Sequence, residues 1–138
     1  MASDPLQQLA NLFIKFPGIG GRQAKRFAYF LVNQDPEFIK ELTFAITDVR
    51  QRVSQCRHCF RLYTKNASEA PVCNLCSDPE RDHTTLLIVE KDPDLNAVEK
   101  TGIYKGDYFV LGGLLPLLEE KESRHIRSGE LVAAVTER

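Results

Sequence analysis

Residues 56–76 read CRHCFRLYTKNASEAPVCNLC, and the spacing of the four cysteines in this stretch decides how the middle of the chain folds. Each Cys-x-x-Cys pair can bind one metal ion from a single tight turn. Two such pairs complete a tetrahedron of thiolates about 2.3 Å from a zinc ion. Because protein ligands fill all four positions, the predicted site is structural and has no place for a catalytic water. The predicted ligands are Cys56, Cys59, Cys73 and Cys76.

Two disulfides or a redox-active pair are the alternatives to this metal site. No apolar stretch approaches the roughly 18 residues of a membrane span, and the N-terminus lacks the basic-then-apolar pattern of an export signal. We therefore expect a cytoplasmic protein that is not bound to a membrane. In that reducing compartment, clustered cysteines favour one structural Zn²⁺. His58 could replace a cysteine as ligand, although we expect it to be a solvated loop residue.

The charge of the chain is divided along its length. Of 138 residues, 43% are hydrophobic and 27% are charged, which is ordinary for a folded protein, and the net charge is −1. Residues 1–66 carry ten Lys and Arg against five Asp and Glu, whereas residues 67–138 carry eight against fourteen. The basic first part favours a nucleic-acid partner, although an uneven surface charge alone would give the same count.

Apolar side chains recur at helical spacing in three segments before the cysteines. They predict helices over residues 5–15, around residues 24–31, and from about 36 to 54. Pro5 suits the first turn of the first helix, and Asp35 or Pro36 is well placed to start the third. The glycine-rich stretch 16–21, FPGIGG, separates the first two helices.

This glycine-rich stretch has the form of a helix-hairpin-helix. Its glycines would expose backbone N–H groups, and the following helix would direct its partial positive charge at a phosphate. Ile19 would fill the space between the two helices, and cations on the next turns could reach neighbouring phosphates. An ordinary tight connection with solvated cations is the alternative. The residues predicted to contact DNA are Gly18, Gly20, Arg22, Lys25 and Arg26.

Beyond the cysteines, the pattern changes to alternating strands and helices. Residues 84–89 and 108–111 are predicted strands, the second ended by two glycines, and residues 94–100 are a predicted helix that ends at Gly102. Ser128 is predicted to cap a last helix that includes Leu131 and Val135. The fold class is therefore α+β, built from several modules.

Glu90 ends the first of these strands, where α/β folds place functional groups. Magnesium-dependent phosphoryl chemistry would need further carboxylates on a neighbouring strand. Asp92 and Asp94 lie too close along the chain to be a clear second ligand set, and no later Asp-x-Asp pair appears. Glu90 and Asp94 are thus a candidate acidic site, and a solvated acidic loop is the favoured interpretation.

Taken in chain order, these features resemble the bacterial RecR family of recombination mediators. The resemblance covers essentially the whole chain. It rests on the four cysteines, on FPGIGGRQAKRFA at 16–28, CSDPERD at 76–82 and Val89-Glu90, and on TGIYKG at 101–106 and VLGG at 110–113.

The resemblance implies three domains and a function. The domains are a helix-hairpin-helix domain over 1–54, a four-cysteine zinc finger over 55–79 and a partial Toprim domain over 80–138. The implied protein is not an enzyme. It binds single- and double-stranded DNA near the nucleoid and acts with RecO and RecF to help RecA load on single-stranded DNA. The basic residues of the family match Arg22 and Arg26, Lys25 is an added cation, and Glu90 matches the Toprim glutamate.

The family's Toprim domain continues past the last predicted helix, with a further strand, a helix and a segment used in assembly. We therefore expect an abbreviated natural protein or a shortened piece of one. Family members form rings around DNA, and here the expectation is a homo-oligomer, a dimer through the N-terminal region or higher. A magnesium-dependent Toprim enzyme acting through Glu90 is the alternative function. A structural remnant without DNA binding is a third.

Overall fold

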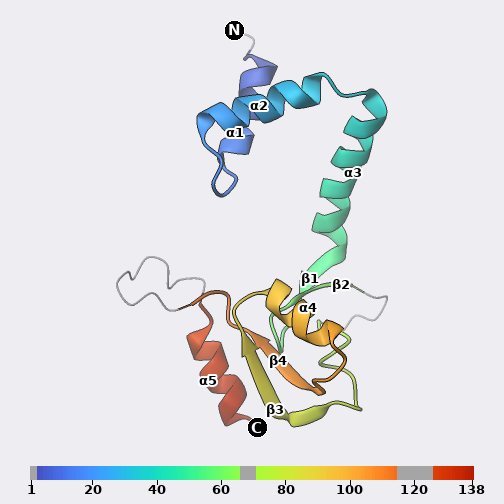
Figure 1. Ribbon diagram of the computed structural model, residues 1–138, viewed down its shortest axis with the longest axis vertical. Helices are drawn as coiled ribbons and strands as arrows, with labels where there is room; N and C mark the ends of the chain where they lie inside the picture. Colours follow the sequence, from blue (N-terminus) through green and yellow to red (C-terminus); the bar gives the residue numbers. More distant parts are fainter. Residues whose placement is uncertain (1–2, 66–70, 115–125) are drawn as a thin grey trace. The chain divides into compact units, whose positions relative to one another are not determined.

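The computed structural model describes residues 3–65, 71–114 and 126–138, and its elements are labelled in Figure 1. The chain divides into two compact units, Met1–Gln51 and Arg52–Arg138. Helices α1 (Pro5–Ile14), α2 (Gly21–Val32) and α3 (Pro36–Arg52) make up the first unit, α3 ending at its boundary. The second unit contains β1 (Val53–Gln55), β2 (Leu62–Thr64), β3 (Asp82–Val89), α4 (Asp92–Lys100), β4 (Gly106–Val110) and α5 (Ser128–Thr136).

In the first unit, α1 and α2 pack through small residues. Asp4 caps α1 by accepting a hydrogen bond from the Leu6 N–H at 3.0 Å, and Pro5 occupies the first turn. Three alanines are at most 2% exposed and allow the helices to approach closely. Larger apolar side chains surround them, among them Ile19 from the connecting turn, which confirms that Ile19 lies against both helices. The buried residues are Ala10, Ala24 and Ala28.

The third helix begins as its sequence predicts and ends earlier. The Asp35 carboxylate accepts a hydrogen bond from the Phe38 N–H at 2.9 Å, which is an N-terminal cap. The helix stops at Arg52, and Val53 is the first residue of β1. The prediction of a helix to residue 54 is therefore wrong at its C-terminal end, because residues 53–55 pair with β2 and form a sheet instead.

The first sheet is an antiparallel pair that the sequence did not predict. Ser54 lies opposite Tyr63 in the β1–β2 register. Each strand has only three residues, which is too short for a period of two to be recognised.

The second sheet is a parallel pair, β3 and β4, connected through α4. Val89 pairs with Val110, and the two strands and α4 share a core of Val89, Leu95, Tyr108 and Val110. Gly102, just after the C-cap of α4, has φ of +70°, as expected for a glycine that ends a helix. The chain thus combines helices with an antiparallel and a parallel pair of strands, which confirms the α+β fold class.

The start of α5 differs from the prediction. Ser128 is its first helical residue, Arg127 is at the N-cap, and no side chain caps the helix. The prediction of a Ser128 cap is wrong. Within the described part of the chain, no helix has both the length and the hydrophobicity to cross a membrane.

Candidate metal centre and nucleic-acid interface

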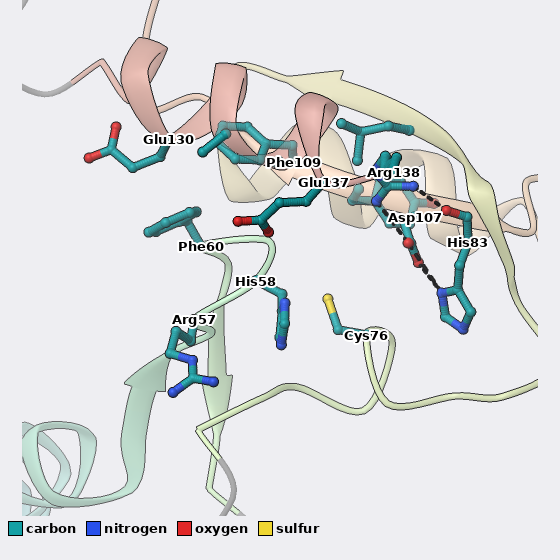
Figure 2. A pocket seen from close by; sticks show the side chains of 14 residues that line it. Arg57, His58, Phe60, Cys76, His83, Asp107, Phe109, Glu130, Glu137 and Arg138 are labelled. Atoms are coloured by element: carbon teal, nitrogen blue, oxygen red, sulfur yellow. Dashed lines mark hydrogen bonds and ion pairs between the residues drawn. The ribbon is translucent and has the colours of Figure 1, made fainter.

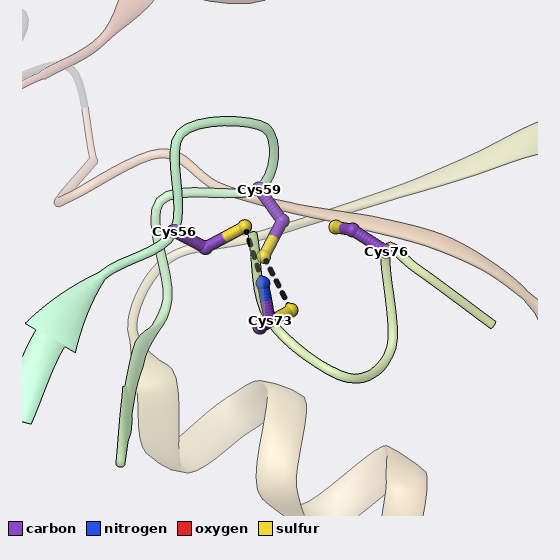
Figure 3. A group of neighbouring side chains, drawn as sticks. All are labelled: Cys56, Cys59, Cys73 and Cys76. Atoms are coloured by element: carbon purple, nitrogen blue, oxygen red, sulfur yellow. Dashed lines mark hydrogen bonds between the residues drawn. The ribbon is translucent and has the colours of Figure 1, made fainter. Parts of the chain in front are cut away.

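The four cysteines converge in the second unit. Cys56, Cys59 and Cys73 are at most 1% exposed, and Cys76 is half-buried. All four sulfur atoms lie within 4.8 Å of one another, and the Sγ atoms of Cys59 and Cys73 are 3.6 Å apart (Figure 3). Zinc–sulfur bonds of about 2.3 Å place sulfur atoms about 3.8 Å apart in a tetrahedron. The cluster therefore has the size of a metal site, and the cysteines are not joined as disulfides.

Two turns hold these sulfur atoms in place. In the first turn, the Cys56 N–H donates to the Arg61 carbonyl at 2.8 Å, and the Phe60 N–H donates to the Cys56 carbonyl at 3.0 Å. Phe60 closes this turn with φ of +65°, a conformation that a non-glycine residue rarely adopts. In the second turn, both the backbone N–H and the hydroxyl of Ser77 donate to the Cys73 carbonyl.

The electrostatics of the cluster fit a bound cation. A hydrogen bond from the Cys59 thiol, aided by those from Cys73 and Cys76, holds the pKa of Cys56 well below its usual value. Hydrogen bonding to Cys56 is in turn the largest cause that raises the pKa of Cys76. Four crowded thiols therefore cannot all ionise by themselves. A bound divalent cation allows all four to be thiolates, so this donor set fits a metal that prefers sulfur.

Beside the cysteines, a cavity of about 630 Å³ separates the first turn from α5 (Figure 2). Cys76 and the exposed His58 both line it. Among the described residues, the group that could hold a metal consists of the four cysteines, and His58 is outside that group. No sequence pattern predicted the cavity, because its walls come from the cysteine turn, the sheet and α5.

The glycine turn between α1 and α2 presents an open surface. Gly18 has φ of +74°, which requires glycine, and Gly20 is the N-cap of α2 without a side-chain hydrogen bond. No atom lies within 4 Å of a Cβ built on either glycine. The three cations that follow are all exposed, and none forms an ion pair with a described carboxylate. They lie at helical spacing along one side of α2, away from the buried alanines, and are Arg22, Lys25 and Arg26.

Two of the acidic residues after β3 accept hydrogen bonds from backbone N–H groups. The Asp92 carboxylate accepts a hydrogen bond from the Leu62 N–H of β2 at 2.6 Å. The Asp94 carboxylate accepts one from the Lys91 N–H at 3.1 Å and so caps α4. Glu90 is half-buried and lies 3.8 Å from the Lys91 ammonium. Of the residues that the structure describes, no third acidic or histidine ligand joins Glu90 and Asp94.

An ion pair between the buried Arg81 and the half-buried Glu99 connects the segment after Cys76 to α4, and the sequence did not single it out. The Arg81 guanidinium donates two hydrogen bonds to Glu99 at 3.0 and 3.1 Å and two to the Gly106 carbonyl. The Tyr108 hydroxyl donates to the same glutamate at 2.8 Å. The sequence pattern that could have pointed to this ion pair is an arginine among acidic residues shortly after Cys76. The pattern does not reveal the partners, because Glu99 and Gly106 are distant in sequence.

Residues 84–137 match the family model of the Toprim domain. Recombination protein RecR of Chloroflexus aurantiacus is 37% identical over 131 residues, which are 95% of this chain and 62% of that protein. RecR of Myxococcus xanthus is 39% identical over 96% of this chain and 64% of its own length. The chain belongs to the RecR family.

RecR of Porphyromonas gingivalis is also 39% identical, over 80% of this chain and 51% of its own length. The chain thus spans about three fifths of the length of the curated RecR relatives it matches. Both the glycine turn and the cysteine cluster fall within the stretch shared with the RecR of Myxococcus xanthus, which leaves out only a few residues of this chain.

Proposed function

We propose that this chain is a DNA-binding mediator of recombinational DNA repair and is not an enzyme. The observation that carries the proposal is the glycine turn, with Arg22, Lys25 and Arg26 exposed on one side of α2. The names of its RecR relatives, which are recombination proteins, support the same role. By the same likeness, it acts with RecO and RecF to help RecA load on single-stranded DNA, as a homo-oligomer associated with the nucleoid.

The glycine turn binds DNA through phosphates. The first N–H groups of α2 have no side-chain cap, and the open surface at Gly18 and Gly20 lets a phosphate approach them. Arg22 and Arg26, one turn apart, then reach adjacent phosphates. These contacts do not read the bases, so both single- and double-stranded DNA bind, and binding weakens as salt rises.

The metal of the cysteine cluster is one structural Zn²⁺. Four sulfur ligands on two short turns favour zinc, and the buried cluster leaves no open coordination position. Cys56, Cys59, Cys73 and Cys76 would hold the ion. It would stabilise a region whose strands have only three residues each.

The test of the main proposal is DNA binding by the Arg22→Ala/Arg26→Ala variant. Fluorescence anisotropy with a labelled 30-nucleotide strand should show at least tenfold weaker binding at moderate salt than the wild type. Lys40→Ala/Arg50→Ala, which removes two exposed cations of α3, is the matched control and should bind nearly as the wild type does. Equal binding by the Arg22/Arg26 variant would refute the assignment of the glycine turn.

A second candidate is a magnesium-dependent nucleic-acid enzyme that uses Glu90, and the Toprim match over residues 84–137 favours it. The use of Asp92 and Asp94 as backbone acceptors speaks against it. The discriminating assay is nicking of supercoiled plasmid with Mg²⁺. Activity that disappears in Glu90→Gln and persists in Glu80→Gln would establish the enzyme. We expect no activity in any of these proteins.

A further inference from the structure

The β1–β2 hairpin and the cysteine turn between its strands form the most basic segment of the second unit. Over residues 52–65 the sequence contains four Arg and Lys and no Asp or Glu, although residues 67–138 carry eight Lys and Arg against fourteen Asp and Glu. We call this segment the basic ribbon. Its cations are Arg52, Arg57, Arg61 and Lys65.

Three carboxylates of the second unit have partners outside the basic ribbon or in its backbone. Glu99 pairs with Arg81, Asp107 pairs with Arg138, and Asp92 accepts a hydrogen bond from a backbone N–H. Across the described residues, none of these acids, nor any other, forms an ion pair with Arg57, Arg61 or Lys65. Such unpaired cations are available to an outside anion.

Three carboxylates share the cavity wall with Arg57, and none of them forms an ion pair with it. Asp107 pairs with Arg138, Glu130 lies in α5, and Glu137 follows the last residue of α5. Figure 2 shows the Arg57 side chain directed away from Glu130 and Glu137. Arg57 is exposed and is free to contact a partner from solvent.

The backbone fixes the spacing of these cations. The Cys56 N–H to Arg61 carbonyl bond, 2.8 Å long, keeps Arg57 and Arg61 in one turn. At the other end of the hairpin, the Lys65 N–H donates to the Arg52 carbonyl at 2.8 Å, which fixes the backbone at Lys65.

From Arg61 to Lys65 the chain runs four residues, or about 13 Å at about 3.3 Å per strand residue. This is about the rise of four nucleotides at roughly 3.4 Å each along one DNA strand. The half-buried Arg61 and the exposed Lys65 at this distance suit a partner with regularly spaced charges. A nucleic-acid backbone has that property, and an acidic protein surface has no fixed repeat.

We propose that the basic ribbon is a second phosphate-contact surface, on a different unit from the glycine turn, and that it binds the sugar-phosphate backbone of DNA through Arg57 and Lys65. The proposal rests on the proposed function, because it assumes that the chain binds DNA. It adds that the metal-binding segment contacts DNA directly, beyond holding the unit together.

The test is the salt dependence of DNA binding by Arg57→Gln/Lys65→Gln. Each phosphate contact in single-stranded DNA contributes about 0.7 to the slope of log K against log salt, so the slope should become shallower by about 1.4. The control is Lys100→Gln/Lys105→Gln, which changes the same net charge at two exposed positions of the same unit and should keep the wild-type slope. Metal content and the circular dichroism spectrum should be equal in all three proteins.

The outcomes are distinguishable. A slope for Arg57→Gln/Lys65→Gln equal to those of wild type and control would overturn the proposal and leave the glycine turn as the DNA site. A wild type that binds no DNA at low salt would instead refute the proposed function. If the variant lost binding to poly-glutamate and kept its DNA slope, the ribbon would be a surface for an acidic protein and the DNA assignment would be wrong.

Discussion

Among individual residues, the buried Arg81 shows how one side chain joins separate parts of the second unit. It is 8% exposed, and its guanidinium binds Glu99 from α4 and the Gly106 carbonyl from β4. Burial by itself raises the pKa of Glu99, but hydrogen bonds from Arg81 and Tyr108 outweigh it and lower that pKa. The carboxylate therefore stays charged and binds both partners. Burial of the Arg81 guanidinium costs desolvation energy, and its hydrogen bonds to Glu99 and to the Gly106 carbonyl offset that cost.

A pH dependence follows from Tyr108 in the same cluster. Burial, then its hydrogen bond to the Glu99 carboxylate, raises the pKa of Tyr108 from 10.0 to about 12. Between these values the unfolded chain releases the phenolic proton and the folded protein keeps it, so stability falls as pH rises. Tyr108→Phe should lose less stability than the wild type between pH 9 and 12, by a difference on the order of 2 kcal/mol.

Urea unfolding at several pH values measures this difference. Tyr29→Phe changes an exposed tyrosine of α2 and is the control. If Tyr108→Phe and the wild type lost the same stability over this range, the assigned role of the Tyr108 proton would be wrong.

Among the elements, the α1–α2 pair depends on the shape of the connecting turn. The helices meet over alanines, so little side-chain volume separates them and the turn must reverse the chain in a few residues. Gly18 makes this reversal with a positive φ, and Gly21 begins α2 in an ordinary helical conformation. Both glycines face open space, so only backbone conformation distinguishes them.

Substitution at these two glycines should therefore give opposite results. Gly18→Ala should destabilise the protein by about 1 kcal/mol, because a Cβ is unfavourable at positive φ. Gly21→Ala should be neutral or stabilising by about 0.5 kcal/mol, because alanine favours the helix and restricts the unfolded chain. Thermal unfolding followed at 222 nm compares them, and equal melting temperatures would contradict the assigned turn.

At the scale of the whole molecule, the cysteine cluster holds together the second unit. The Cys59 carbonyl accepts a hydrogen bond from the Val110 N–H of β4 at 2.8 Å. The Phe60 ring packs against the Phe109 ring with centroids 5.5 Å apart. The Arg127 guanidinium lies over the Phe60 ring, 5.1 Å from its centroid. The first cysteine turn thus contacts β4 and the start of α5, and the core of α1 and α2 belongs to the other unit.

Removal of the metal should consequently affect the two units differently. With a strong chelator, the amides of Leu62 and Val110 should exchange hydrogen at least tenfold faster, because Leu62 directly follows the first cysteine turn and the acceptor of the Val110 N–H is the Cys59 carbonyl. Ala24 and Ala28 should keep their protection. Hydrogen exchange by NMR measures both sets, and equal loss of protection in the two units would show that they do not fold separately.

The sequence by itself determined those features that depend on neighbours along the chain. The spacing of the cysteines, the helices of the first unit and the strands near residues 84–89 and 108–111 all follow from short-range patterns of apolar residues, glycine and proline. The resemblance to the RecR family also rested on local motifs, and the relatives confirm it. The DNA contacts at Arg22, Lys25 and Arg26 stay a prediction.

Only the tertiary structure decided which partner each polar group has. Asp92 binds the Leu62 N–H thirty positions away, and Arg81 binds Glu99 eighteen positions away. No local pattern specifies such pairs, because they form only after the β1–β2 hairpin and α4 have packed on the same unit. Asp92 and Asp94 therefore accept hydrogen bonds from backbone N–H groups in the fold, and among the described residues Arg57, Arg61 and Lys65 form no ion pair with a carboxylate.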